Sequence, residues 1–74
     1  MANNIFFRVQ VCGLDGGDIR HEDFATLEKA EKYFNKCEFD RNSETLELYK
    51  MVESNDDTHS IELIEMLYYN RVLI

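Results

Sequence analysis

Apolar and polar residues alternate along the first part of the chain. Residues 5–12 read IFFRVQVC, and the residues that share one face of an extended segment are Ile5, Phe7, Val9 and Val11. A period of two predicts a half-buried β-strand. The segment GLDGGD at 13–18 follows, and its Asp-Gly pair suits the positive φ of a tight hairpin turn. Residues 19–24 are therefore expected to return as a short edge strand.

A helical period follows this hairpin. The apolar residues spaced three, four and three apart are Leu27, Ala30, Phe34 and Cys37. The spacing places them on one stripe of a helix, which we predict over residues 27–37. Thr26 is the expected N-cap, and Phe24 just before it is expected to fold back onto the helix.

The second half of the chain predicts another hairpin. Residues 45–53 and 59–68 carry alternating apolar side chains, and the polar segment between them has the composition of a turn. The second run also fits a helical period, so a helix there is the alternative. The closing Val-Leu-Ile is apolar, and we expect it to pack on another part of the molecule.

These elements predict the fold class. We expect one α+β domain of 74 residues with the order ββαββ, in which an antiparallel four-stranded sheet carries one helix packed on one face. The helix needs an apolar surface, and one side of the sheet is the only candidate.

The other side of the sheet is expected to be open. If Leu46 and Leu48 face the helix, and Ile61 and Leu63 do the same on the next strand, the residues that point away are Glu47, Tyr49, Met51, Glu53, Glu62, Ile64, Met66 and Tyr68. An exposed apolar patch of this kind is typical of an interaction surface. The alternative is a bulge, or coverage by the C-terminal segment, that removes the patch.

The net charge of −7 lies in one region. Residues 38–65 contain nine acidic and two basic side chains, while the six acidic and six basic side chains elsewhere cancel. This sign disfavours direct binding to a phosphate backbone and suits a basic protein surface. With no signal peptide, no membrane span and only two cysteines, a cytoplasmic protein without membrane partners is expected. A Cys12–Cys37 disulfide is the alternative to two reduced thiols.

The candidate catalytic and metal-binding groups of the chain lack the partners that their chemistry requires. His21 with Asp23, and His59 with Asp56 and Asp57, lack the ligand sets of zinc or calcium sites. Cys12 and Cys37 have no expected base beside them. The glycines at 13–17 form no phosphate loop. We therefore predict no enzyme activity, no metal and no cofactor.

The segment FATLEKAEKYF at 24–34 resembles a pattern in small proteins of phages and other mobile elements, where a strand ends in F-x-T and a helix begins L-E-x-A-E-x-Y. The chain's size, acidity and predicted layout are similar to those of several anti-CRISPR proteins. The resemblance implies an inhibitor of a host defence complex in the host cytoplasm. It assigns no site residue.

The leading hypothesis is a non-catalytic interaction protein, and its predicted partner-binding residues are Glu47, Tyr49, Glu53, Asp56, Asp57, Glu62, Ile64 and Met66. Carboxylates along the second hairpin, with Glu65 among them, are spaced along a strand like successive phosphates, so nucleic-acid mimicry is one form of this hypothesis. The alternatives are a homodimer or larger oligomer that buries Tyr49, Met51, Ile64, Met66 and Tyr68, and a protein that binds a small ligand.

Overall fold

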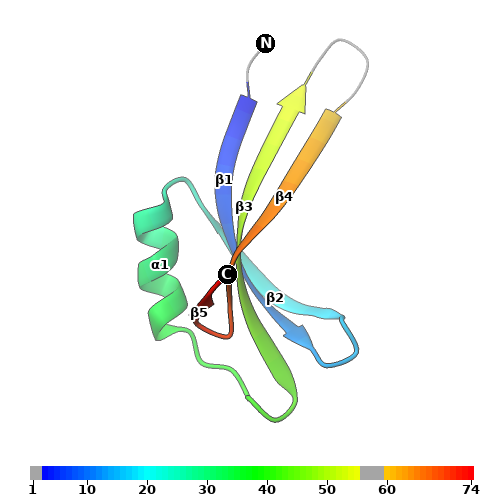
Figure 1. Ribbon diagram of the computed structural model, residues 1–74, viewed down its shortest axis with the longest axis vertical. Helices are drawn as coiled ribbons and strands as arrows, with labels where there is room; N and C mark the ends of the chain where they lie inside the picture. Colours follow the sequence, from blue (N-terminus) through cyan, green and yellow to red (C-terminus); the bar gives the residue numbers. More distant parts are fainter. Residues whose placement is uncertain (1–2, 56–59) are drawn as a thin grey trace.

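Strands β1 (Asn3–Gly13) and β3 (Glu44–Asn55) form the middle of one antiparallel sheet (Figure 1). The computed structural model describes the backbone of residues 3–55 and 60–74 and the side chains of residues 4–53 and 64–74. The other strands are β2 (Asp18–Phe24), β4 (Ser60–Tyr69) and β5 (Val72–Leu73), and the strand order is β2-β1-β3-β4-β5. In the first hairpin Gln10 lies opposite His21, and Cys12 lies opposite Asp18.

The four-stranded ββαββ prediction is wrong, because the sheet has a fifth strand. The chain turns back after β4 through Asn70 and Arg71, whose φ angles of 49° and 67° are those of a two-residue hairpin turn. Neither residue is glycine, so the usual sequence signal for such a turn is missing. Residues 60–69 form β4, which excludes the helical alternative for them.

Helix α1 (Leu27–Lys36) begins at the predicted residue. The Thr26 hydroxyl accepts a hydrogen bond from the Lys29 amide at 3.3 Å, so the predicted N-cap is confirmed. Phe24 lies 5.2 Å from the Tyr33 ring, measured between centroids, so the chain does fold back where expected. The helix ends one residue earlier than predicted, with Cys37 as the C-cap.

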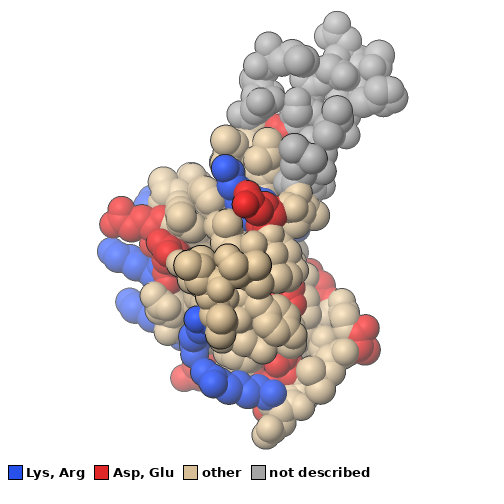
Figure 2. Space-filling view, in the orientation of Figure 1, with Lys and Arg blue, Asp and Glu red and all other residues tan. Residues whose placement is uncertain are grey.

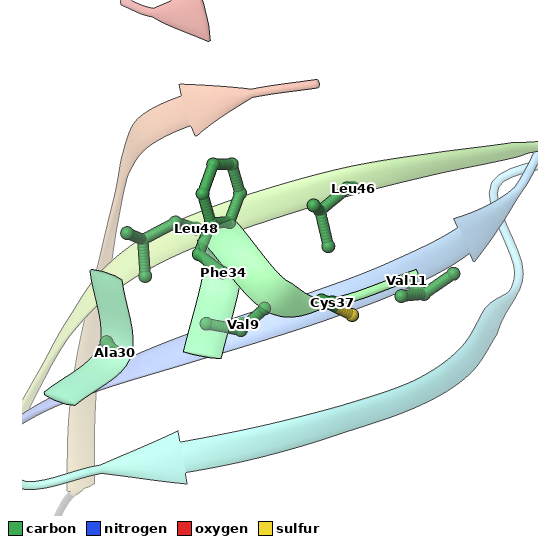
Figure 3. Packing of buried hydrophobic residues seen from close by; sticks show 7 residues of the cluster. All are labelled: Val9, Val11, Ala30, Phe34, Cys37, Leu46 and Leu48. Carbon is green, nitrogen blue, oxygen red and sulfur yellow. The ribbon is translucent and has the colours of Figure 1, made fainter. Parts of the chain in front are cut away.

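The core lies between α1 and one face of β1 and β3 (Figure 3). Its buried apolar residues are Val9, Val11, Ala30, Phe34, Cys37, Leu46 and Leu48. All seven occupy positions that the strand period or the helix period predicts to face the core. Burial of this apolar area is the main driving force for folding, at roughly 25 cal/mol per Å².

A β-bulge changes the face of the residues at the end of β4. Leu48 pairs with Tyr68 but Tyr49 pairs with Met66, so Leu67 is an extra residue in β4. Tyr68 therefore lies on the helix side, where its ring is 5.4 Å from that of Phe34 and its hydroxyl donates to Glu31 at 2.9 Å. The prediction that Tyr68 points away from the helix is wrong for this reason.

The helix covers only part of the sheet. A helix of ten residues is about 15 Å long, whereas a strand of twelve residues spans about 40 Å. Figure 1 shows β1, β3 and β4 running on past α1. Val9, under the helix, is 1% exposed, but Ile5 on the same face of the same strand is 51% exposed. Beyond the helix, no described element covers either side of the sheet.

Candidate functional site

The sheet face turned away from α1, called the open face below, is the candidate site. Strand alternation gives it side chains from four neighbouring strands. Those described are Asp18, His21 and Asp23 from β2, Asn4, Phe6, Arg8, Gln10 and Cys12 from β1, Thr45, Glu47, Tyr49, Met51 and Glu53 from β3, and Ile64, Met66 and Tyr69 from β4. No other described element packs over this face.

Two adjoining hollows mark the open face. The larger one, about 390 Å³, lies beside the β1–β2 turn at residues 13–17 and is lined in part by Glu47 and Tyr69. The smaller one, about 270 Å³, is lined in part by Met51 and Ile64. Gln10 and Tyr49 line both hollows, so the two lie side by side on the sheet. We call the larger one the Glu47 hollow.

Glu47 is buried at 8% exposure although no helix lies over it. Its Oε2 accepts a hydrogen bond from the Thr45 hydroxyl at 3.0 Å, and its Oε1 accepts one from the Tyr49 hydroxyl. The Cys12 thiol lies 3.8 Å from Oε1 as a third, weaker donor. The outward alternation of β3 had predicted Glu47 as an exposed contact, and its burial makes it part of the floor of the hollow instead.

These contacts shift the pKa values of the groups around Glu47. Burial raises the pKa of the Cys12 thiol above its ordinary 9.0, and the nearby negative charges of Glu47 and Asp18 add to the rise. Burial, followed by the hydrogen bond to Glu47, raises the pKa of Tyr49 as well. Both donors thus stay protonated at neutral pH. A protonated thiol is a weak nucleophile, so this arrangement does not favour cysteine chemistry.

The remaining predicted partner-binding residues are placed differently. Ile64 is 61% exposed, while Met66 and Glu53 are half-buried. Glu62 lies opposite Glu53 in the register of β3 and β4, and its side chain is outside the described residues. Asp56 and Asp57 lie wholly outside them. Met51 is only 2% exposed, so the oligomer hypothesis loses one of its expected contacts.

Acidic and basic side chains are distributed unequally over the molecule. Lys29, Lys32 and Lys36 are on α1, and Figure 2 shows Lys and Arg gathered on the side where the helix lies. On the open face the described cation is Arg8, which pairs with Asp23 at 2.8 Å and lies over the Phe6 ring. The field of the open face is therefore negative around Glu47.

Of the residues expected as metal-ligand candidates, His21 and Asp23 are engaged with other groups, and His59, Asp56 and Asp57 lie outside the described residues. The His21 ring lies 2.9 Å from Asp18, and Asp23 is held by Arg8. Among the described side chains, no group of three or more His, Cys, Asp or Glu is arranged to hold a metal ion. Cys12 and Cys37 are free thiols. The described part of the chain also contains no helix with the length and hydropathy needed to cross a membrane.

Comparison with protein-family models, with curated proteins and with solved structures yields no match.

Proposed function

We propose that this chain is a non-catalytic binding protein that docks a basic partner protein on the open face. The observation that carries the proposal is the hollowed, uncovered face that combines exposed Ile64 with a buried carboxylate, Glu47. Aromatic and Met side chains are enriched at the centres of protein interfaces, and complementary charge selects the partner. The resemblance of residues 24–34 to mobile-element proteins makes a host defence complex the first partner to test.

A pair of matched variants tests the proposal. Ile64→Lys places a cation on the open face, whereas Leu73→Lys changes an apolar residue of similar exposure, 69%, on the helix side of the β4–β5 hairpin. We expect Ile64→Lys to reduce capture of the partner from host lysate at least tenfold, and Leu73→Lys to leave it unchanged. Capture should also weaken between 50 and 500 mM salt, because the attraction is partly electrostatic.

Circular dichroism of both variants controls for folding. Equal capture by wild type and Ile64→Lys would contradict docking on the open face. Loss of capture with Leu73→Lys alone would move the interface to the C-terminal hairpin.

A further inference from the structure

The Glu47 hollow is an open depression that brings together polar groups from three strands and a turn. Its volume of about 390 Å³ is within the range of small-ligand sites. The side chains that matter for recognition are Gln10, Cys12, Thr45, Glu47, Tyr49 and Tyr69. Tyr69, 40% exposed, stands at the rim, and Glu47 forms the floor.

The carboxylate of Glu47 accepts hydrogen bonds but has no cation beside it within the described residues. All three of its donors, Thr45, Tyr49 and Cys12, are neutral groups. Every hydrogen bond is directed toward the carboxylate, which is the pattern of an ionised group. A buried charge is costly unless it is paired, so the hollow is electrostatically complementary to a cation.

The number of lone-pair directions that remain free on the Glu47 carboxylate determines which kind of cation binds it best. A carboxylate offers about four lone-pair directions, and three donors already approach Glu47. A guanidinium binds a carboxylate best through two parallel hydrogen bonds, whereas an ammonium acts as a point charge through one. The aromatic rings of Tyr49 and Tyr69, which also line the hollow, add attraction for a cation over their faces.

We infer that the Glu47 hollow binds the ammonium group of a lysine side chain of the partner protein. This inference rests on the proposed function and names the chemistry of its anchor point. The apolar stem of the lysine runs out over the rim at Tyr69, and its head meets the free lone pair of Glu47. The adjoining depression at Met51 and Ile64 then takes an apolar neighbour from the same partner.

A titration with short peptides tests the anchor without the partner. The full chain, labelled with ¹⁵N, is titrated with acetyl-Gly-Lys-Gly-amide and with the same peptide carrying norleucine or arginine in place of lysine. We expect the lysine peptide to shift the amide signals of Cys12, Thr45 and Glu47, and to bind at least tenfold more tightly than the norleucine peptide. The arginine peptide should bind more weakly than the lysine peptide.

Two variants connect the binding to the hollow. Glu47→Gln keeps the shape and removes the charge, so it should abolish the difference between lysine and norleucine. Glu53→Gln removes a charge elsewhere on the open face and is its matched control. Should Glu47→Gln fail to fold, Tyr69→Leu, at the exposed rim, should weaken lysine binding severalfold while the spectrum stays dispersed.

Equal binding of the lysine and norleucine peptides, or full binding of the lysine peptide by Glu47→Gln, would contradict the inference that the Glu47 hollow binds a lysine ammonium. Such a result would leave the proposed function standing if Ile64→Lys still lost partner capture. Lysine-specific binding with unaltered partner capture by Ile64→Lys would instead overturn docking on the open face.

Discussion

Tyr49 holds the Glu47 carboxylate in place at the floor of the hollow. Its hydroxyl donates to Oε1, and the Thr45 hydroxyl donates to Oε2 from the same strand. Because side chains two residues apart share a face of a strand, β3 itself supplies both donors. The buried carboxylate therefore depends on its own strand for two of its three donors.

Tyr49→Phe removes one of these donors. We expect the free energy of unfolding to fall by about 1.5 kcal/mol, at the lower end for a hydrogen bond to a charged group because the hollow admits water. Urea unfolding followed by circular dichroism measures the change. Tyr69→Phe, at the rim of the same hollow, is the control and should change stability by less than about 0.5 kcal/mol. Equal losses for the two variants would contradict the role given to the Tyr49 hydroxyl.

Stability should also fall at alkaline pH. The folded pKa values of Cys12 and Tyr49 lie above their ordinary values of 9.0 and 10.0, and those of Tyr33 and Tyr68 are raised in the same direction. Above pH 9 the unfolded chain therefore loses protons that the folded chain keeps, so unfolding becomes easier. We expect a constant unfolding free energy from pH 7 to 9 and a decline above it.

Urea midpoints from pH 7 to 10.5 measure this dependence. Tyr49→Phe removes one of the groups responsible, so its decline above pH 10 should be shallower than that of wild type. A stability that rises above pH 9 would contradict these shifts.

At the scale of elements, the β4–β5 hairpin is attached to the C-terminal end of α1 through Arg71. Its guanidinium donates to the Phe34 carbonyl at 3.4 Å and to the Cys37 carbonyl, and it lies over the Phe39 ring. A cation at this end also interacts favourably with the helix dipole. Asn70 pairs with the backbone of Leu46 on β3 through both its amide and its side chain. The turn thus connects the helix and the sheet.

Two substitutions of Arg71 distinguish the contribution of its side-chain contacts to stability from that of its backbone conformation. Arg71→Ala and Arg71→Gly both lose the bonds to the helix carbonyls, but only glycine adopts a φ of 67° without steric cost. We expect both variants to be less stable than wild type, and Arg71→Ala to be less stable than Arg71→Gly by about 1 kcal/mol. Thermal and urea unfolding measure the order. A more stable Ala variant would contradict the positive φ at this position.

These elements differ in whether the local sequence pattern predicts them. The helix from Leu27, its Thr26 cap and the strand that contains Val9 all follow from periods and from residues close in sequence. The fifth strand does not follow in this way, because Arg71 has no intrinsic preference for a positive φ. It is held there by hydrogen bonds to the backbone carbonyls of Phe34 and Cys37, which are distant in the sequence. The closing residues 72–74 pair through their backbone, but their side chains remain exposed, so the expectation that they pack is wrong.

At the scale of the whole molecule, the net charge and the exposed apolar surface have opposite effects on self-association. The net charge of −7 repels a second copy, while Ile5 and Ile64 leave apolar surface on the two sides of the uncovered part of the sheet. The chain's outline, 44 × 27 × 20 Å, reflects this extension past the helix. Salt therefore controls which effect dominates.

We expect a monomer of 8.8 kDa at 10 µM protein and 50 mM salt, and growing self-association at 500 mM salt as the repulsion is screened. Multi-angle light scattering measures the mass. Ile64→Lys should reduce the association at high salt, and Leu73→Lys serves as its control. A dimer that is independent of salt would contradict this expectation and favour the homodimer alternative.

The sequence by itself determined the elements whose stabilising groups are neighbours in the chain: two hairpins, a capped helix and the choice of the Leu46 and Leu48 side for the core. Only the tertiary structure decided the bulge at Leu67, the fifth strand and the burial of Glu47. The physical reason is that each of these depends on contacts between different strands or with the helix end. Because Glu47 stands between the core residues Leu46 and Leu48, alternation predicts an exposed side chain, and only Cys12 and the turn beside it enclose the carboxylate.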